Sequence, residues 1–379
     1  MRRHAFSFPF HSDRDYLSTV KLLRPLLLVA VGVLLFAGFT QRVAPPPASA
    51  VATKVVGAAN TFLATLSEAE RTKVTFDFSS NQRTVWSNLP SGIYQRNGLR
   101  IGDLSATQRE AALALVAAAL SRSGYQKVTD IMNGDEVLRN QGGGRTGGRP
   151  GAPGAPAAGG GRGGRGGGIQ FGSDEYYISF VGAPSATNPW MLQFGGHHLA
   201  INVTMVGSDN VMTPSLPAAQ PARYVLNGQT IRPLGKENDK GFALINALDD
   251  NQKKQAILAY QVRDLVLGPG NDGKVIQPEG MLASAMNDNQ QAMLLDIVHE
   301  WVGILNDEGA AAKMAEVKSN LAKTYFAWSG STTNGELAYY RIQGPTLVIE
   351  YAPQQGDLDH IHTIYRDPTN DYGARLVKH

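Results

Sequence analysis

The sequence contains no cysteine. Its 379 residues therefore form no disulfide bond, offer no thiolate to a metal ion and include no cysteine nucleophile. Any metal ion bound by this chain must be held by nitrogen and oxygen ligands. Histidine, the usual nitrogen ligand, occurs only eight times, so clustered histidines are informative here.

The chain also lacks the short motifs of several large protein classes. It has no Gly-x-Ser-x-Gly elbow, no Gly-x4-Gly-Lys-Ser/Thr loop, and no Gly-x-Gly-x-x-Gly between a strand and a helix. Helix-turn-helix, zinc-finger and RNA-recognition motifs are missing too. The net charge of +3 comes from basic residues within 1–50 and within the glycine-rich stretch 141–168, so the remainder is acidic. We therefore expect no nucleic-acid partner.

Residues 22–39 are strongly apolar. Their charge-free and proline-free part, Leu26–Phe39, is 14 residues long, which is typical of a signal peptide and shorter than the ~20 apolar residues of a spanning helix. Cleavage after Ala50 would release residues 51–379. Alternatively, the segment is retained as an N-terminal membrane anchor with its basic flank in the cytoplasm. Both interpretations predict an exported protein, periplasmic or extracellular, that contacts a membrane only through this segment.

Four short segments share a helix-start pattern, in which an apolar residue precedes a capping residue and Glu or Gln follows three positions after the cap. The first two caps are 38 residues apart, and the last two are also 38 residues apart. Equal spacing of four similar helix starts indicates an internal duplication. The capping residues are Ser67, Ser105, Asp249 and Asn287.

Similar β-patterns follow the second helix of each pair. Residues 177–182 and 325–330 are aromatic segments that end in glycine. Residues 190–206 and 338–352 then read as β-hairpins. Each half therefore predicts two helices followed by a hairpin.

We expect an α+β fold in which residues 51–379 form a single domain. Two helix-helix-hairpin units, about 55–210 and about 240–379, would surround a mixed or antiparallel sheet and be related by a pseudo-twofold axis. Residues 141–168, rich in glycine, arginine and proline, interrupt the first unit and predict a flexible surface insertion. This insertion is either a tolerated loop expansion or a basic segment that contacts an anionic polymer or membrane.

Four histidines lie in two tight clusters. His360 and His362 alternate in a segment that reads as a strand, so both point to one face and can offer two imidazoles to one ion. His197 and His198 are adjacent, so in an extended chain they point to opposite faces and only one of them joins such a site. We favour His198.

Pairing of the two halves would place the turn that carries His198 beside the segment after the second hairpin. We therefore predict a site for a divalent metal ion, of unknown identity, formed by His198, His360 and His362. The alternative is that these histidines only satisfy hydrogen bonds within a sheet.

Three further residues are candidates for the chemistry at this site. Glu237 and Glu350 are candidates for a general base or a fourth ligand. Arg366 is a candidate for orienting an anionic substrate group, although its segment, Arg-Asp-Pro-Thr-Asn-Asp, is also typical of a turn.

Four segments resemble a family labelled domain of unknown function 3500: residues 194–202, 233–248, 277–281 and 360–373. The resemblance covers most of residues 55–379, and its most specific parts are the His-His and His-x-His segments. The Gly/Arg insertion is a difference in length that leaves these motifs intact. The resemblance implies a coherent, mostly secreted family and implies no activity or catalytic residues.

Two functions from different classes remain. The first is an exported metal-dependent enzyme, hydrolytic, that acts on an unknown small molecule or polymer. The alternative is a non-catalytic ligand-binding protein of the cell envelope, which would grip its ligand with aromatic side chains near the hairpins. These aromatic residues are Trp190, Trp328, Tyr339 and Tyr340.

Overall fold

Eight α-helices, two large β-sheets and a two-stranded β-hairpin form an α+β fold in the residues described by the computed structural model, which are 49–142 and 168–377. The expected α+β class is confirmed, but one mixed and one antiparallel sheet stand where a single sheet was expected. The described residues belong to one compact unit, Val43–His379. The apolar segment 22–39 and most of the Gly/Arg insertion lie outside the described residues.

The first four helices all begin after a serine cap, and two of these serines are the ones that the sequence pattern identified. Ser67 and Ser105 each form a reciprocal capping box with the residue three positions later. The Gln108 side chain of the second box donates hydrogen bonds to the Glu70 carboxylate of the first. The helices are α1 (Ala50–Ala64), α2 (Glu68–Val74), α3 (Ala106–Ala119) and α4 (Arg122–Asn140).

The first sheet is mixed and has seven strands. Its order is β1-β3-β4-β5-β6, with β2 paired to β3 and β7 paired to β5, and only β1 runs parallel to its neighbour β3. Its strands are β1 (Thr75–Phe76), β2 (Leu99–Arg100), β3 (Tyr177–Val181), β4 (Trp190–Gly195), β5 (Leu199–Val206), β6 (Asp209–Val211) and β7 (Leu216–Pro217). A separate two-stranded hairpin follows, β8 (Tyr224–Leu226) and β9 (Gln229–Ile231).

The second set of elements repeats this order of helices and then strands. Asp249 and Asn287 form capping boxes, and the amides of Gln252 and Gln290 bond to each other as Glu70 and Gln108 do. The helices are α5 (Gly235–Ala247), α6 (Asp250–Ala256), α7 (Asp288–Val302) and α8 (Asp307–Ser319). The antiparallel sheet is β10 (Met281–Leu282), β11 (Tyr325–Gly330), β12 (Ala338–Gly344), β13 (Leu347–Pro353) and β14 (Ile361–Arg366), paired in that order.

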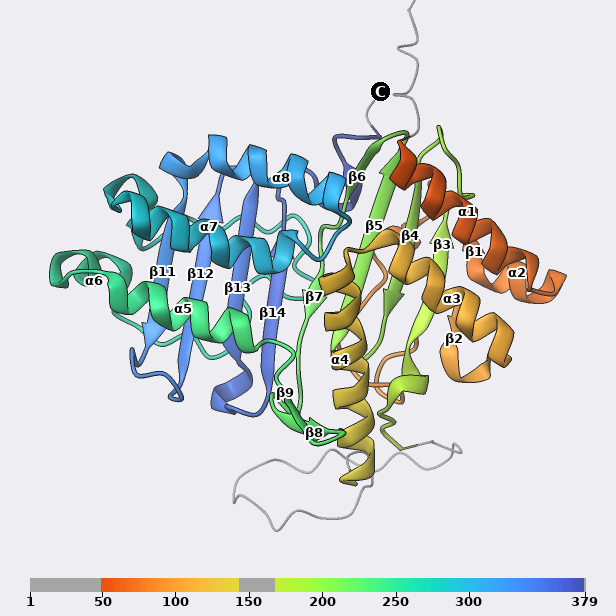
Figure 1. Cartoon of the computed structure of the whole chain (residues 1–379), viewed down its shortest axis with the longest axis horizontal. Helices are drawn as coiled ribbons and strands as arrows, with labels where there is room; N and C mark the ends of the chain where they lie inside the picture. Colours follow the sequence, from red (N-terminus) through yellow and green to blue (C-terminus); the bar gives the residue numbers. More distant parts are fainter. Residues whose placement is uncertain (1–48, 143–167, 378–379) are drawn as a thin grey trace, which may run out of the picture. The chain divides into compact units, whose positions relative to one another are not determined.

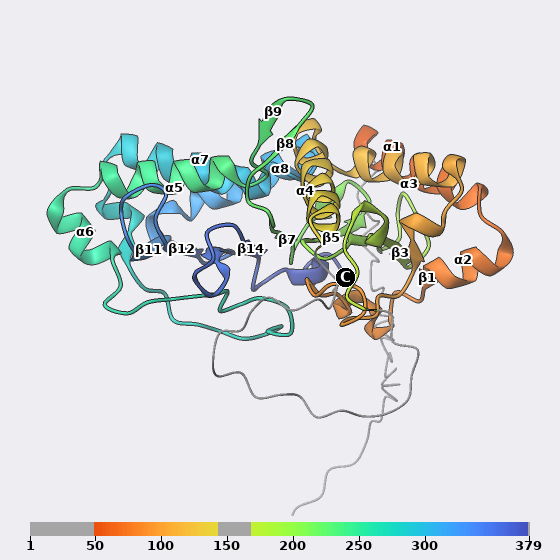
Figure 2. The same cartoon turned by 90° about the horizontal axis from the view of Figure 1, so that it is seen from below.

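The helices cover one face of the two sheets, and the irregular segments 77–98 and 257–280 lie on the other face (Figures 1 and 2). Phe180 of β3 is fully buried and packs against Phe62 of α1. Trp301 of α7 donates from its indole to Thr363 of β14. None of the helices in the described ranges is both long enough and apolar enough to cross a membrane.

A short extended segment, Ser215–Ala219, joins the two sheets. On one side, Leu216 and Pro217 pair with the start of β5. On the other side, Ser215 and Tyr365 of β14 exchange two backbone hydrogen bonds of 2.9 Å, and Ala219 bridges to Ile361. The start of β5 therefore lies on one side of Ser215–Ala219, and β14 lies on the other side. We call these three neighbouring segments the seam.

The helical turns before α4 and α8 also pair with each other. Leu120 and Leu305 form an antiparallel bridge. Ser121 N–H donates to the carbonyl of Ile304 over 3.0 Å, and Asn306 N–H donates to the carbonyl of Ala119 over 3.3 Å. Each of these residues holds the same position relative to its own helix start, so the contact is reciprocal.

Candidate metal centre

The two histidine pairs meet at the seam. His197 and His198 lie at the start of β5, and His360 and His362 lie at the start of β14. The tight turn between β4 and β5 carries His197 and His198 directly before Leu199. His360 directly precedes β14, and His362 lies inside it. His198 is fully buried, His197 and His362 are nearly so, and His360 is partly exposed.

Three imidazole nitrogens converge at this point. His360 Nε2 lies 3.1 Å from His198 Nε2 and 3.0 Å from His362 Nε2. Two nitrogens bound to one ion at ~2.0–2.1 Å lie about 2.8–3.4 Å apart for ligand angles between 90° and tetrahedral. Each of the two distances to His360 Nε2 fits a pair of ligands on one ion, and the structure brings together the three histidines selected from the sequence.

His197 differs from the sequence expectation. The chain bends at His197 and His198 instead of running extended, so the two rings do not point to opposite faces. Their centroids are 3.5 Å apart, and Phe171 packs on His197 at 4.7 Å. His197, His198 and His360 each offer a ring nitrogen within 4.8 Å of the others, so this buried group could hold a metal ion. Both adjacent histidines therefore lie at the group, which the expectation for an extended chain did not include.

Asp135 of α4 fixes the orientation of His198. Its Oδ1 lies 2.7 Å from His198 Nδ1, and its Oδ2 accepts a 2.7 Å hydrogen bond from the Tyr176 hydroxyl. Burial opposes charge on Asp135, but His198 and His197 lower the pKa of its carboxyl group below the ordinary value. An ionised carboxylate only accepts hydrogen bonds, so His198 carries its proton on Nδ1 and directs the Nε2 lone pair at His360.

Asp264 holds the same relation to His362 from the opposite direction. It lies in the segment on the helix-free face, and its Oδ1 is 3.3 Å from His362 Nδ1. The backbone N–H of Leu265 also donates to this oxygen. Because about 40% of its side chain is exposed, Asp264 is the carboxylate at this cluster that solvent reaches.

The cluster has more lone pairs than protons. His198 and His362 both direct Nε2 at His360 Nε2, and a neutral His360 can donate from that nitrogen to only one of them. Burial, followed by neighbouring histidines, lowers the pKa of His198 and of His360 to about 3 each, so both rings are neutral at neutral pH. A bound cation would satisfy a lone pair that the single proton on His360 cannot.

Sequence reasoning missed both aspartates, and one of them left a signal. The buried positions on one face of α4 follow helical spacing: Val128, Ile131, Met132 and Asp135. A carboxylate at an apolar position requires a buried partner, because an unpaired buried charge is costly. Asp264 lies in an irregular segment without periodicity, so its sequence context carries no comparable signal.

Glu237 lies in the first turn of α5 and pairs with Lys127 of α4. Its carboxylate is fully buried, and burial raises its pKa above the ordinary value despite the Lys127 charge. Among the described residues, no hydrogen bond or ion pair joins Glu237 to the histidines.

Glu350 and Arg366 hold the segment that carries Asp264. Glu350 accepts from the backbone N–H groups of Val266 and Leu267, at 3.0 and 2.8 Å, and from the Tyr339 hydroxyl. Arg366 donates to the carbonyl of Leu267 and pairs with Asp272 and Asp371. Within the described part of the chain, neither residue contacts a histidine through a hydrogen bond or ion pair.

The four aromatic residues that would serve a binding protein are core residues. Each is at most 1% exposed, and Trp328 and Tyr340 stack on each other. They are therefore closed to a ligand. Their full list is Trp190, Trp328, Tyr339 and Tyr340.

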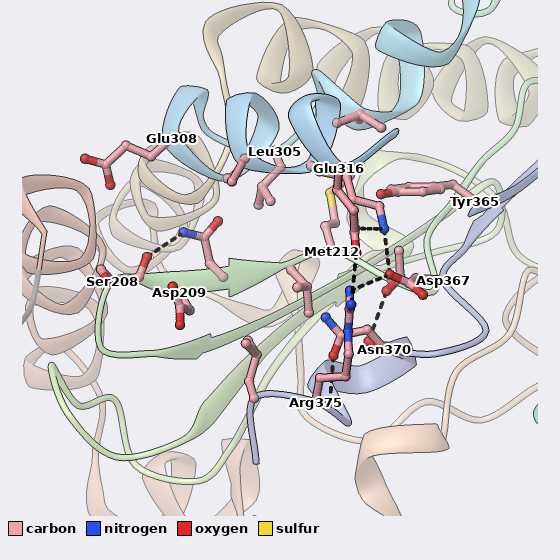
Figure 3. Close-up of a pocket in the computed structure, with 18 residues that line it drawn as sticks. Ser208, Asp209, Met212, Leu305, Glu308, Glu316, Tyr365, Asp367, Asn370 and Arg375 are labelled. Carbon is pink, nitrogen blue, oxygen red and sulfur yellow. Dashed lines mark hydrogen bonds and ion pairs between the residues drawn. The ribbon is translucent and has the colours of Figure 1, made fainter. Parts of the chain in front are cut away.

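A cavity of about 310 Å³ lies away from the histidines, beneath α8 and beside β6 (Figure 3). Its two cations are neutralised by two acids. Lys313 donates to Glu316 and Asp367, and Arg375 donates to the same pair. Both cations of this cavity are thus already paired with carboxylates.

A family model described as "Protein of unknown function (DUF3500)" matches residues 48–374, so the chain belongs to this family and the resemblance seen in the sequence is confirmed. Searches of curated proteins and of solved structures found no match.

Proposed function

We propose that this member of the DUF3500 family is an exported metal-dependent enzyme whose divalent ion is held by His198, His360 and His362. The observation that carries the proposal is that His198 Nε2 and His362 Nε2 lie 3.1 and 3.0 Å from His360 Nε2. A divalent ion there would supply Lewis acidity and an activated water, the chemistry of hydrolysis.

The carboxylates behind the histidines support this assignment. Histidines that bind metals usually donate their second ring N–H to a carboxylate or carbonyl, which fixes the tautomer. Asp135 and Asp264 contact Nδ1 of His198 and of His362, respectively. We assign Asp135 a positioning role. Asp264, which is partly exposed, replaces Glu237 and Glu350 as the candidate for accepting a proton from water.

We also infer that the domain arose by internal duplication, with a pseudo-twofold axis through its centre. The reciprocal contacts of Leu120 with Leu305 and of Ser215 with Tyr365 support this inference. Gly98 and Gly280 also support it. Both have positive φ, and they directly precede β2 and β10, respectively. Gly98 lies against β3, which follows α4, and Gly280 lies against β11, which follows α8. A self-complementary contact is what a twofold relation between similar units produces.

Export and substrate remain proposals based on the N-terminal sequence. Residues 22–39 would deliver the domain to the periplasm or the cell exterior, either as a cleaved signal or as an anchor. The substrate would be a small molecule or polymer of that compartment.

Elemental analysis tests the metal assignment. The full-length protein would be purified without a histidine tag, beside the double variant His360→Ala/His362→Ala and the control His299→Ala. His299 is exposed on α7 and lies outside the cluster. We expect one equivalent of zinc, iron, copper or manganese in the parent and in the control, and none in the double variant.

A parent that holds no metal and takes up none when metal is added would refute the proposal. Equal metal content in the double variant would refute the ligand set. The single variant His197→Ala distinguishes two possible ligand sets that share His198 and His360. If His362 is the third ligand, as we propose, this variant retains the ion; if His197 is the third ligand, the variant loses it.

A further inference from the structure

Arg96 is a largely buried cation without an acidic partner among the described residues. Its Nη2 donates to the backbone carbonyls of Ser87, Leu89 and Gly196, at 2.8, 2.6 and 2.6 Å. Its Nη1 is buried and donates to nothing in the described structure. Buried arginines are normally paired, because removing a charge from water is costly.

The surroundings of Arg96 do not neutralise it. Burial lowers the pKa of its guanidinium, and the carboxylate among the groups that act on this pKa is Asp135, which already bonds to His198 and Tyr176. Arginine stays charged even so. By contrast, both cations of the cavity in Figure 3 contact carboxylates directly.

Arg96 lines a small cavity on the helix-free side of the first sheet. The volume is about 40 Å³, above the ~10–15 Å³ that one water needs, so it admits a few waters or a small head group. Polar side chains line it, including Asn97, Ser179, Gln193 and Asn202, and no Asp or Glu is among the lining residues. The cavity thus carries one positive charge, hydrogen-bonding walls and no negative charge.

The cavity also lies beside the histidine turn. Gly195 lines the cavity. Arg96 donates a hydrogen bond to the carbonyl of Gly196, which directly precedes His197. We propose that this cavity is an oxyanion-binding pocket, in which Arg96 pairs with a carboxylate or phosphate group. If the histidines hold an ion, which rests on the proposed function, the pocket would fix the anionic group of the substrate beside it.

Calorimetric titration of the full-length protein with inorganic phosphate, and separately with formate, tests the pocket. We expect saturable binding of at least one anion, weakened at least tenfold in Arg96→Gln. The control Arg83→Gln removes the same charge from the same irregular segment, at a residue that does not line the cavity, and should bind like the parent. Preference for phosphate or for formate would identify the head group.

A second variant keeps the test decisive if Arg96→Gln fails to fold. Asn97 is exposed and lines the pocket, so Asn97→Asp supplies the carboxylate that Arg96 lacks and should abolish anion binding. Absence of binding in the parent, or unchanged binding in both pocket variants, would overturn the proposal. The metal content of Arg96→Gln and Asn97→Asp should equal that of the parent, which separates failure of this pocket from failure of the metal centre.

Discussion

His198 and His360 are separated by 162 positions in the chain, yet their Nε2 atoms are 3.1 Å apart. The first belongs to the turn of one hairpin, and the second precedes the strand that follows the other hairpin. The pairing of the two sheets through Ser215–Ala219 brings them together. The following predictions concern this junction and the elements that support it.

Asp135→Asn should weaken metal binding by about 10–100-fold without removing a ligand, because an amide can present the wrong group to His198 Nδ1. A competition titration with a chromophoric chelator measures the change. Asp130→Asn is the matched control, since Asp130 lies on the same helix and bonds to Gln126. An unchanged affinity in Asp135→Asn would contradict the positioning role.

Metal removal should lower the stability of the domain, because the ligands come from both halves and exist as a site only in the folded state. At a free-ion concentration 100 times the dissociation constant, the ion contributes about 2.7 kcal/mol. Urea unfolding with and without a chelator measures it. The His360→Ala/His362→Ala variant should show no chelator effect, and a chelator effect of equal size there would place the ion elsewhere.

Glu237→Gln should destabilise the protein by about 3 kcal/mol, because it leaves Lys127 without its main buried partner. Glu300, 3.6 Å from Lys127, compensates only in part. Denaturant unfolding checks this against Glu110→Gln, an exposed residue of α3. Metal content should stay at the parental level, and its loss would return Glu237 to the list of ligands.

Alanine at Gly98 or Gly280 should each destabilise the fold by more than about 1 kcal/mol. Both glycines have positive φ, +99° and +91°, and a Cβ would strike the carbonyl of Ile178 or of Phe326. Gly57→Ala is the opposite control, because that glycine is in an exposed part of α1 with free space around it and should gain about 0.5–1 kcal/mol. Thermal unfolding of the three variants tests the order, and a tolerated alanine at only one of the two β-positions would count against their equivalence.

Because of Asp371, the free energy of unfolding should decrease as the pH rises from about 4 to about 6. Burial raises the pKa of its carboxyl group to about 6, although Arg366 opposes the shift. The protonated form is thus favoured by the folded state, so this contribution is complete below the unfolded pKa of ~3.9 and is lost as pH passes the folded pKa. It amounts to at most about 3 kcal/mol. Asp371→Asn should abolish this slope in a pH series of urea unfolding curves, and an identical slope in both proteins would disprove the assignment.

Local patterns predicted the elements well because caps and hydrophobic spacing act within a few residues. Ser67, Ser105, Asp249 and Asn287 all cap the helices expected of them. The equal spacing of these caps also has a tertiary cause, since Gln108 reaches Glu70 and Gln290 reaches Gln252 across 38 residues.

The candidate site was predictable only in the parts that the two predicted hairpins constrain. His198, His360 and His362 follow from the positions of two hairpins, whereas Asp135 arrives from a helix packed over the turn. Glu237 and Glu350 were selected from the sequence because a carboxylate can serve as a general base or a metal ligand. Their environments, a lysine and two backbone N–H groups, depend on packing that local sequence does not encode.

The strand that joins the sheets has a consequence for solubility. Edge strands expose unpaired backbone groups and invite pairing with other chains. Without Ser215–Ala219, β14 and the first residues of β5 would face each other as two such edges in the middle of the molecule. Because this one segment bonds to both, the centre of the fold offers no template for aggregation within the described residues. A proline in place of Ser215 or Ala219 would remove a backbone N–H that bonds to β14 and would expose part of that strand's edge.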